Sequence, residues 1–380
     1  MFRNYRFKNY NFRLVVFVVA LTIYGILIIG SANKDYQNKQ IIGMILGIIV
    51  MVAISMIDYS ALLSLHWLFY LAGCGALLMV FIPGLSHSSK GATRWVRLGG
   101  FQFQPSELAK VLVVLFLAWY LMKYQEDLNK PKRFLMTVVI CMIPLGLIVL
   151  EPDLSTTVVT FCIIFTMLFY AGLSKKVVGA VVGLIAAGVF GVIFLTLHSG
   201  GVLQGYQNDR IAAWLEPDKF PSEAMQQQNS IMAIGSGELF GKGLANNGAN
   251  SVKNGNYIPE PHTDFIFAVT GEETGFLGTL LMIVLLFAIV FECLRTAKKA
   301  KDLAGQLICI GMASLVGFQA FVNICVVTGL MPNTGLTLPF VSYGLTSLVT
   351  LYFGIGFVLN VSIQSKKFYA DERNFTFDLS

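Results

Sequence analysis

Residues 14–30 read LVVFVVALTIYGILIIG, a run without a single charged side chain. A stretch of this length and apolarity can cross the roughly 30 Å hydrocarbon core of a bilayer as a helix. Because lipid offers no hydrogen bonds to the backbone, such a segment must satisfy its own N–H and C=O groups, as a helix does. Similar runs recur along all 380 residues, of which 56% are hydrophobic and only 13% charged. The chain is therefore predicted to be an all-α integral membrane protein.

Hydropathy predicts about ten membrane-spanning helices in one polytopic domain, residues 1–380. The predicted spans are residues 12–31, 40–57, 62–82, 106–123, 134–150, 154–172, 176–198, 264–293, 304–330 and 337–363. The spans leave two sizeable loops, residues 83–105 and the large loop 199–263. No internal repeat is visible, which disfavours a transporter built from inverted repeats. The first apolar run is longer than the core of a usual signal peptide, so we expect it to remain in the protein.

Lysine and arginine predict which side of the membrane each loop faces. If the N-terminus is cytoplasmic, the segments on its side hold 17 of the 27 Lys and Arg residues, and the opposite segments hold nine. Short cytoplasmic loops are enriched in these residues, so both termini are predicted to be cytoplasmic and both sizeable loops extracytoplasmic. The net charge of +6 follows from this topology, and no nucleic-acid partner is expected.

The cysteines, histidines and glycines give no sign of a disulfide, a zinc site or a nucleotide cofactor. All six cysteines fall in or at the ends of apolar runs, and none forms a Cys-x-x-Cys pair. The four histidines lack the spacing of metal ligands. Residues 235–243, GSGELFGKG, resemble a phosphate loop only superficially, because Gly243 stands where that loop needs Ser or Thr. We therefore expect no organic cofactor.

Ionisable residues inside or at the ends of spans are costly in lipid and usually serve function. Glu107 and Lys110 are three residues apart, so they share one face of a predicted helix. Two interpretations stay open: an internal ion pair that orients the helix, or the charged wall of a polar cavity. Glu151 and Asp153 flank Pro152 at an outer helix junction, where Asp153 can cap the next helix and still serve a second role.

Another group of polar residues lies around the start of the eighth predicted span. Residues 258–267 read IPEPHTDFIF, so a proline-rich loop ends where an apolar helix begins. Thr263 or Asp264 is predicted to be the cap or a first-turn residue of that helix, which places the Asp264 carboxylate at the outer membrane surface. Arg94 and Arg210 lie in the outer loops. Together these residues predict a polar cavity for an anionic ligand.

Several motifs together resemble the SEDS family (shape, elongation, division and sporulation proteins) over nearly the whole chain. They are KGATRW at residues 90–95, QPSELAK at 104–110, EPDL at 151–154, QQQNSIMAIGSGELFGKG at 226–243, PHTDFIFAV at 261–269, EETGF at 272–276 and LPFVSYG at 338–344. One such motif alone is weak, whereas the set in family order is specific. The chain departs from the family pattern where Leu345 and Thr346 replace Gly-Ser, and where Ser155 replaces a common Gly.

The resemblance implies a peptidoglycan glycosyltransferase that acts on the outer side of the bacterial plasma membrane. Such proteins polymerise lipid II: a sugar 4-hydroxyl attacks the anomeric carbon of a glycan on undecaprenyl pyrophosphate, and a β-1,4 link forms with inversion. The short tails and the sequence motifs around residues 90–110 and 151–157 favour the RodA elongation branch over FtsW, and a division or sporulation enzyme of the FtsW or SpoVE type stays open as an alternative. A lipid II flippase, another polyprenyl-linked sugar polymerase or ligase, and a scaffold for a partner enzyme stay open as alternatives.

Together with the charge pattern, the resemblance assigns roles to individual residues. Asp264 is the expected catalytic aspartate, which removes the proton of the attacking hydroxyl. The expected substrate- and pyrophosphate-binding residues are Arg94, Glu107, Lys110, Asp153, Arg210, Gln227, His262, Thr263 and Ser342. A Mg²⁺ or Mn²⁺ ion could assist the leaving group, with Glu107, Glu151 and Asp153 as candidate ligands. The expected partners are a class B penicillin-binding protein (a transpeptidase) and other membrane proteins of the elongation complex.

Overall fold

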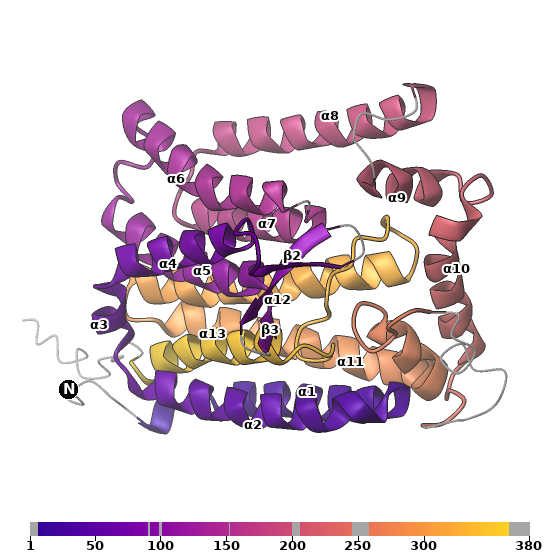
Figure 1. Ribbon diagram of the computed structural model, residues 1–380. Coiled ribbons are helices and arrows are strands. Elements are labelled where there is room, and N and C mark those ends of the chain that lie inside the picture. Colours follow the sequence, from indigo (N-terminus) through magenta and orange to yellow (C-terminus); the bar gives the residue numbers. More distant parts are fainter. Residues whose placement is uncertain are drawn as a thin grey trace, which may run out of the picture.

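The computed structural model describes residues 7–89, 92–98, 101–151, 153–199, 206–244 and 258–364. Its elements are η1 (Phe7–Asn9), α1 (Phe12–Ala32), α2 (Lys34–Met56), α3 (Tyr59–Leu63), α4 (His66–Met79), β1 (Ser86–Ser89), β2 (Ala92–Leu98), β3 (Phe101–Phe103), α5 (Pro105–Lys123), α6 (Pro131–Leu150), α7 (Leu154–Tyr170), α8 (Lys175–Ser199), α9 (Tyr206–Leu215), α10 (Pro221–Ser236), α11 (Ile266–Lys299), α12 (Leu303–Val327) and α13 (Leu345–Ile363). Figure 1 shows most of the helices running side by side across the molecule, so the predicted all-α membrane fold is confirmed. Both termini, part of the large loop, and Lys90, Gly91 and Pro152 of the motifs lie outside the described residues.

Ten apolar helices in the described part of the chain correspond to the ten predicted spans. Eight of them are long and apolar enough to cross a membrane: α1, α2, α5, α6, α8, α11, α12 and α13. The other two, α4 and α7, are shorter. Helices α5, α12 and α13 are mostly buried at the centre of the bundle, whereas large side chains such as Leu135 (65% exposed) and Phe287 (70% exposed) face outward. An apolar outer surface of this kind suits contact with lipid tails.

The last predicted span, residues 337–363, is wrong at its start. Helix α13 begins only at Leu345. Pro339 cannot continue a helix, and Phe340 takes a left-handed backbone conformation with φ of 64°. The segment 331–344 is therefore irregular backbone between α12 and α13.

The two sizeable loops contain secondary structure that hydropathy does not reveal. Loop 83–105 forms a three-stranded antiparallel sheet in the order β1-β2-β3, and loop 199–263 includes α9 and α10. Strand β2 carries one extra residue, Arg94, because His87 pairs with Trp95 whereas Ser88 pairs with Thr93. A bulge of this kind bends a strand and redirects the side chain of the extra residue.

Helix α11 is broken near its start at Gly275, whose φ of 66° and ψ of −163° are not helical. Four backbone hydrogen bonds to residues 238–243 satisfy the peptide groups that the break releases. They are Lys242 N–H to Glu272 C=O (2.9 Å), Gly243 N–H to Glu273 C=O (3.0 Å), Phe276 N–H to Glu238 C=O (2.8 Å) and Leu277 N–H to Leu239 C=O (3.2 Å). A helix break at membrane depth is tolerated only when its peptide groups find such partners. The glycine-rich stretch thus has a structural role and does not form a phosphate loop.

Gly241 permits this close approach, so we predict that Gly241→Ala destabilises the protein more than Gly243→Ala. Both glycines have left-handed φ values, 79° and 93°, which cost an alanine about 1 kcal/mol. A Cβ atom on Gly241 would lie 2.2 Å from the Glu273 carbonyl oxygen, whereas a Cβ on Gly243 meets open space. Overpacking adds roughly 1–3 kcal/mol. Thermal unfolding of the two purified variants in detergent measures the difference, and equal melting temperatures would contradict it.

Candidate active site

A polar cavity of about 130 Å³ lies where β2, α9, the entry to α11 and the segment 331–344 meet. Its lining residues are Arg94, Trp95, Gln104, Arg210, Gln226, Pro259, Glu260, Thr263, Asp264, Phe265, Asn333, Gly335, Thr337 and Tyr343. The cavity brings together four of the residues predicted to be functional, namely Arg94, Arg210, Thr263 and Asp264. The other predicted residues, Glu107, Lys110, Asp153, Gln227, His262 and Ser342, lie outside its lining.

Asp264 lies just before α11 and does not cap that helix. The N-cap residue is Phe265, and no side chain forms a capping hydrogen bond. The prediction that Thr263 or Asp264 is the cap or a first-turn residue is therefore wrong. The Thr263 hydroxyl instead donates to the carbonyl of Glu260 (2.9 Å), within the preceding turn. The Asp264 side chain lines the cavity instead of closing the helix end.

Two polar side chains hold the backbone around Asp264. The buried Asn323 amide of α12 donates to the carbonyls of Asp264 (2.9 Å) and Leu336 (2.5 Å). The Ser342 hydroxyl donates to the Thr263 carbonyl (2.7 Å) and accepts a hydrogen bond from the Leu338 N–H (2.7 Å). We call Asn323 and Ser342 the polar clamp, because they tie the entry to α11 to the irregular segment between α12 and α13.

His262 supports the same segment from behind the cavity. Its ring is buried and stacks on Tyr36 of α2, with ring centroids 4.2 Å apart and 17° between the planes. Its carbonyl accepts the N–H of Tyr343 (2.9 Å), and the Tyr343 ring lies 4.5 Å from that of Tyr36. His262 therefore positions the chain that carries Asp264 and does not line the cavity itself.

Arg210 of α9 faces the Asp264 carboxylate near Gly335. One of its guanidinium nitrogens donates to the carbonyl of Asn333 (2.8 Å). A Cβ atom on Gly335 would lie 3.3 Å from Asp264 Oδ2 and 3.9 Å from an Arg210 nitrogen, so both groups border one small space. Burial and the charge of Arg94 lower the pKa of Arg210 to about 10, against the opposing effect of nearby carboxylates. A partly buried cation of this kind gains from an anionic ligand that bonds to it.

Arg94 is the second cation of the cavity, and Asp153 positions it. A guanidinium nitrogen of Arg94 lies 3.8 Å from one Asp153 oxygen, and the Gln104 amide donates to the other (3.2 Å). Asp153 also accepts the Thr156 N–H (3.1 Å) as the N-cap of α7. The predicted capping role of Asp153 is confirmed, and its second role is the contact with Arg94.

Glu151 lies beside these charges, at the junction between α6 and α7 and outside both helices. Its side chain is fully buried, and neither carboxylate oxygen has a hydrogen-bond partner among the described residues. Burial, and to a lesser degree the charge of Asp153, raises the pKa of Glu151 to about 8, while Arg94 acts in the opposite direction. Glu151 therefore carries a proton at neutral pH.

Glu107 and Lys110 form a buried ion pair on α5, at 2.7 Å. Lys110 also donates to the Gln319 side chain (2.7 Å), and the Ser347 hydroxyl donates to Glu107 (2.8 Å). Gln319 in turn donates to the backbone of Thr337 (3.1 Å), which lines the cavity. Of the two interpretations left open by the sequence, the geometry favours the internal pair, which braces the cavity from within the bundle.

Two neighbouring glutamines of α10 make different contacts, and only one of them lines the cavity. The Gln227 amide donates to the carbonyls of Val326 (2.6 Å) and Met331 (2.7 Å), so it fastens α10 to the end of α12. Gln226, which is absent from the predicted residues, lines the cavity and accepts a hydrogen bond from Asn333 (3.0 Å).

Asn323 and Gln319 are also absent from the predicted residues. Their positions within an apolar span are a signal, because a polar side chain in lipid needs a partner that it usually finds on another helix. Asn333 and Gly335 carry no comparable signal, since nothing in their local sequence indicates that the segment folds back toward Asp264.

The predicted metal ligands do not converge. The described residues contain no group of three or more His, Cys, Asp or Glu side chains that could hold a metal ion. Lys110 and Ser347 engage the two oxygens of Glu107, which keeps it from joining Glu151 and Asp153. The candidate set does not fit a divalent cation, so the catalytic step proposed below uses none. The Mg²⁺ or Mn²⁺ requirement stays a prediction.

Comparison with known proteins identifies the family. Residues 6–367 match the family model described as "Cell cycle protein", which groups FtsW, RodA and SpoVE. The chain belongs to the SEDS family. The resemblance deduced from the motifs is thereby confirmed.

Relatives of this SEDS protein carry both FtsW and RodA names. A probable peptidoglycan glycosyltransferase FtsW of Trichlorobacter lovleyi is 35% identical over 373 residues, or 94% of each chain. A solved chain described under "Structural coordination of polymerization and crosslinking by a peptidoglycan synthase complex" is 29% identical, with a TM-score of 0.77 over 93% of this chain and 97% of that one. The crystal structure of RodA from Thermus thermophilus is 28% identical, with a TM-score of 0.69 over 93% and 96% of the two chains.

The buried Glu151 predicts a pH-dependent stability for this SEDS protein. Its folded pKa of about 8 exceeds the usual value of 4.5, so the folded state holds a proton that the unfolded state releases between those values. Stability should therefore fall as pH rises from about 5 to 8, by up to about 1.4 kcal/mol per pH unit. Glu151→Gln should remove this slope in thermal unfolding measured across that range. Glu126→Gln, at an exposed acid, should keep it, and parallel curves for the wild type and Glu151→Gln would contradict the assignment.

Proposed function

We propose that this SEDS protein, a peptidoglycan glycosyltransferase, polymerises lipid II on the outer face of the bacterial plasma membrane. The acceptor is lipid II, and the donor is a growing glycan carried on undecaprenyl pyrophosphate. The observation that carries the proposal is the cavity in which the Asp264 carboxylate lies beside Arg94 and Arg210. The transfer needs a base and cations together, because a hydroxyl loses its proton while an anion leaves.

In the proposed step, the 4-hydroxyl oxygen of the acceptor attacks the anomeric carbon of the donor. The O–H bond breaks and its proton passes to Asp264. The new C–O bond forms as the bond to pyrophosphate breaks, and that electron pair leaves on the phosphate oxygen. A single displacement inverts the anomeric centre and gives the β-1,4 link, so one base is enough.

Arg94 and Arg210 are the groups proposed to receive the pyrophosphate. Guanidinium groups bind phosphate oxygens through paired N–H donors. Asp153 already orients Arg94, and the Asn333 carbonyl orients Arg210. Donors that are fixed before the reaction stabilise developing charge without reorganising.

We propose cell elongation as the cellular role, with division or sporulation synthesis as the alternative. The RodA-like sequence motifs around residues 90–110 support elongation, whereas the FtsW name of the 35% identical relative supports division. A class B penicillin-binding protein is the proposed partner, which the similarity to a chain from a peptidoglycan synthase complex supports. Expression in rod-shaped bacteria depleted of RodA or of FtsW separates the roles, since restored rod shape indicates elongation and restored septation indicates division.

Asp264→Asn is expected to abolish polymerisation while leaving the protein folded, because the amide keeps the size of the side chain but cannot accept the proton. General base catalysis contributes about 10²–10⁴-fold, so the rate should fall by at least about 100-fold. Glycan length on gels, after incubation of the purified protein with lipid II in detergent, measures this activity.

Asp209→Asn is the matched control for that experiment, because Asp209 is an exposed acid of α9 outside the cavity lining. It should polymerise like the wild type. Full activity of Asp264→Asn would refute the general-base role. Transport cannot occur in detergent, so failure of the wild type to make polymer would favour the flippase alternative.

Arg94→Ala should lower kcat/KM for polymerisation by roughly 100-fold, as expected for the loss of one fixed donor to the leaving group. Arg97→Ala, three residues along the same strand, is the matched control because Arg97 is exposed and outside the cavity lining. Steady-state kinetics with lipid II compares the two variants. Equal losses would show that general surface charge, not the Arg94 contact, binds the substrate.

A further inference from the structure

A larger pocket, of about 500 Å³, lies at the other end of α11 from Asp264. It is lined by Lys8, Asn9, Tyr10, Asn11, Phe12, Arg13, Glu292, Arg295, Thr296, Lys299 and Ser362. These residues come from the last turns of α11, the segment that leads into α1, and the end of α13. The distribution of Lys and Arg predicts that this face is cytoplasmic. We call it the basic pocket.

Positive charge dominates the basic pocket. Four basic side chains line it against one acid, which leaves a formal net charge of +3. The acid, Glu292, is buried and already engaged, since Asn11 donates to one of its oxygens (3.0 Å) and Arg295 lies 3.4 Å from the other. Glu292 therefore organises the wall and leaves the charges of the remaining basic residues unneutralised.

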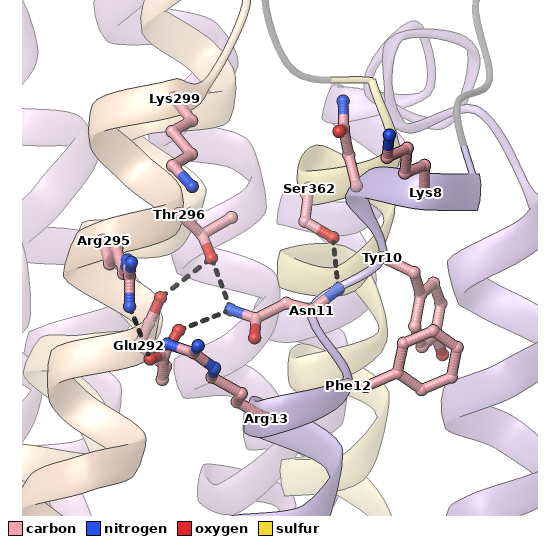
Figure 2. A pocket seen from close by; sticks show the side chains of 11 residues that line it. Lys8, Tyr10, Asn11, Phe12, Arg13, Glu292, Arg295, Thr296, Lys299 and Ser362 are labelled. Carbon is pink, nitrogen blue, oxygen red and sulfur yellow. Dashed lines mark hydrogen bonds and ion pairs between the residues drawn. The ribbon is translucent and has the colours of Figure 1, made fainter.

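The wall of the basic pocket is held by hydrogen bonds between three elements, as Figure 2 shows. The Asn11 amide donates to Thr296 of α11 (3.1 Å) as well as to Glu292, and the Asn11 N–H donates to Ser362 of α13 (3.3 Å). Thr296 in turn donates to the Glu292 carbonyl (2.8 Å). The pocket is thus a built feature of the fold, in which the chain entering α1 is fixed against two other helices.

Three of the four basic side chains, those of Lys8, Arg13 and Lys299, have no partner among the residues that the structure describes. Arg13 and Lys299 form no hydrogen bond or ion pair with the residues that the structure describes, and both are exposed. In Figure 2, Arg13 extends from α1 toward Glu292, and Lys299 lies above Thr296 on α11. An anion between them would meet charge from both sides.

Aromatic side chains border the same pocket. The rings of Tyr10 and Phe12 lie 4.8 Å apart, and Phe12 is 66% exposed at the start of the first span. Aromatic side chains at the ends of spans favour the level of the lipid headgroups. Basic pockets between helices on the cytoplasmic side are a common arrangement for binding anionic headgroups.

We infer that the basic pocket binds the phosphate headgroup of an anionic glycerophospholipid from the cytoplasmic leaflet. The volume lies within the range of about 300–1,000 Å³ found for small-molecule sites. The charge selects a phosphate, and the aromatic rings at the start of a membrane span favour a phosphate that is attached to acyl chains. A free phosphate offers the same anion without the chains, so the test includes both. The inference does not depend on the proposed polymerase activity.

The test titrates the full chain, purified in a nonionic detergent, with short-chain phosphatidylglycerol, short-chain phosphatidylcholine and inorganic phosphate. Native mass spectrometry counts the bound molecules. Phosphatidylglycerol should bind at least about tenfold more tightly than the other two. Arg13→Gln combined with Lys299→Gln should weaken its binding by about 25-fold, from about 1 kcal/mol for each charge near the lipid surface.

Two further variants make the test specific. Lys175→Gln combined with Lys176→Gln removes the same charge from exposed residues at the start of α8, and it should leave phosphatidylglycerol binding unchanged. Arg13→Lys combined with Lys299→Arg keeps the charge and should keep the binding, which guards against a loss through misfolding. Polymerisation should survive in all of these variants, because none of the altered residues lines the Asp264 cavity.

Three results would overturn the inference. Binding of inorganic phosphate as tight as that of phosphatidylglycerol would assign the pocket to a free anion. The α8 variant could lose as much binding as the Arg13 and Lys299 variant, which would reduce the effect to overall charge. Equal affinities for phosphatidylglycerol and phosphatidylcholine would show that the pocket does not distinguish lipids by headgroup charge.

Discussion

The candidate site depends on the polar clamp, in which Asn323 and Ser342 join two stretches of irregular backbone inside a helical membrane protein. Irregular backbone at membrane depth is tolerated only where protein or a water-filled cavity satisfies its peptide groups. Asn323 supplies both of its amide protons to carbonyls of the two stretches, and Ser342 bonds to each of them. The Asp264 carboxylate reaches the cavity because its own backbone is held in this way and not by the helix that follows.

Three ionisable groups at or beside the cavity are kept from carrying an isolated charge. Arg94 forms an ion pair with Asp153, and Arg210 donates a hydrogen bond to the carbonyl of Asn333. Glu151 keeps its proton, because burial raises its pKa, and so it carries no charge. Moving an unpaired charge out of water costs several kcal/mol of free energy. Each of these arrangements lowers that cost. The result is a small polar site with fixed donors, which is the arrangement that favours a reaction in which negative charge moves to a leaving group.

Sequence reasoning predicted the spans well and the site only in part. Lipid imposes one rule on every crossing segment, so hydropathy alone located the ten apolar helices, although it misplaced the start of α13. Hydropathy failed where the local backbone decides the structure. Pro339 and Phe340 delay the start of α13, and the two sizeable loops form a short sheet and two helices. Reasoning about helix ends wrongly made Asp264 or Thr263 a cap residue, whereas the family motif singled out Asp264. The clamp residue Asn323 is not among the predicted site residues, because an uncharged amide within a span is a weaker sign of function than an ionisable side chain.

Chemical rescue tests most directly whether the carboxylate at position 264 acts as the base. Asp264→Ala would empty part of the cavity that this side chain lines. Formate, added in increasing concentration to that purified variant with lipid II, should restore glycan synthesis in a saturable manner, and chloride at equal ionic strength should not. If formate restored nothing while the variant stayed folded and still bound lipid II, the carboxylate would not be the proton acceptor and the account would be contradicted.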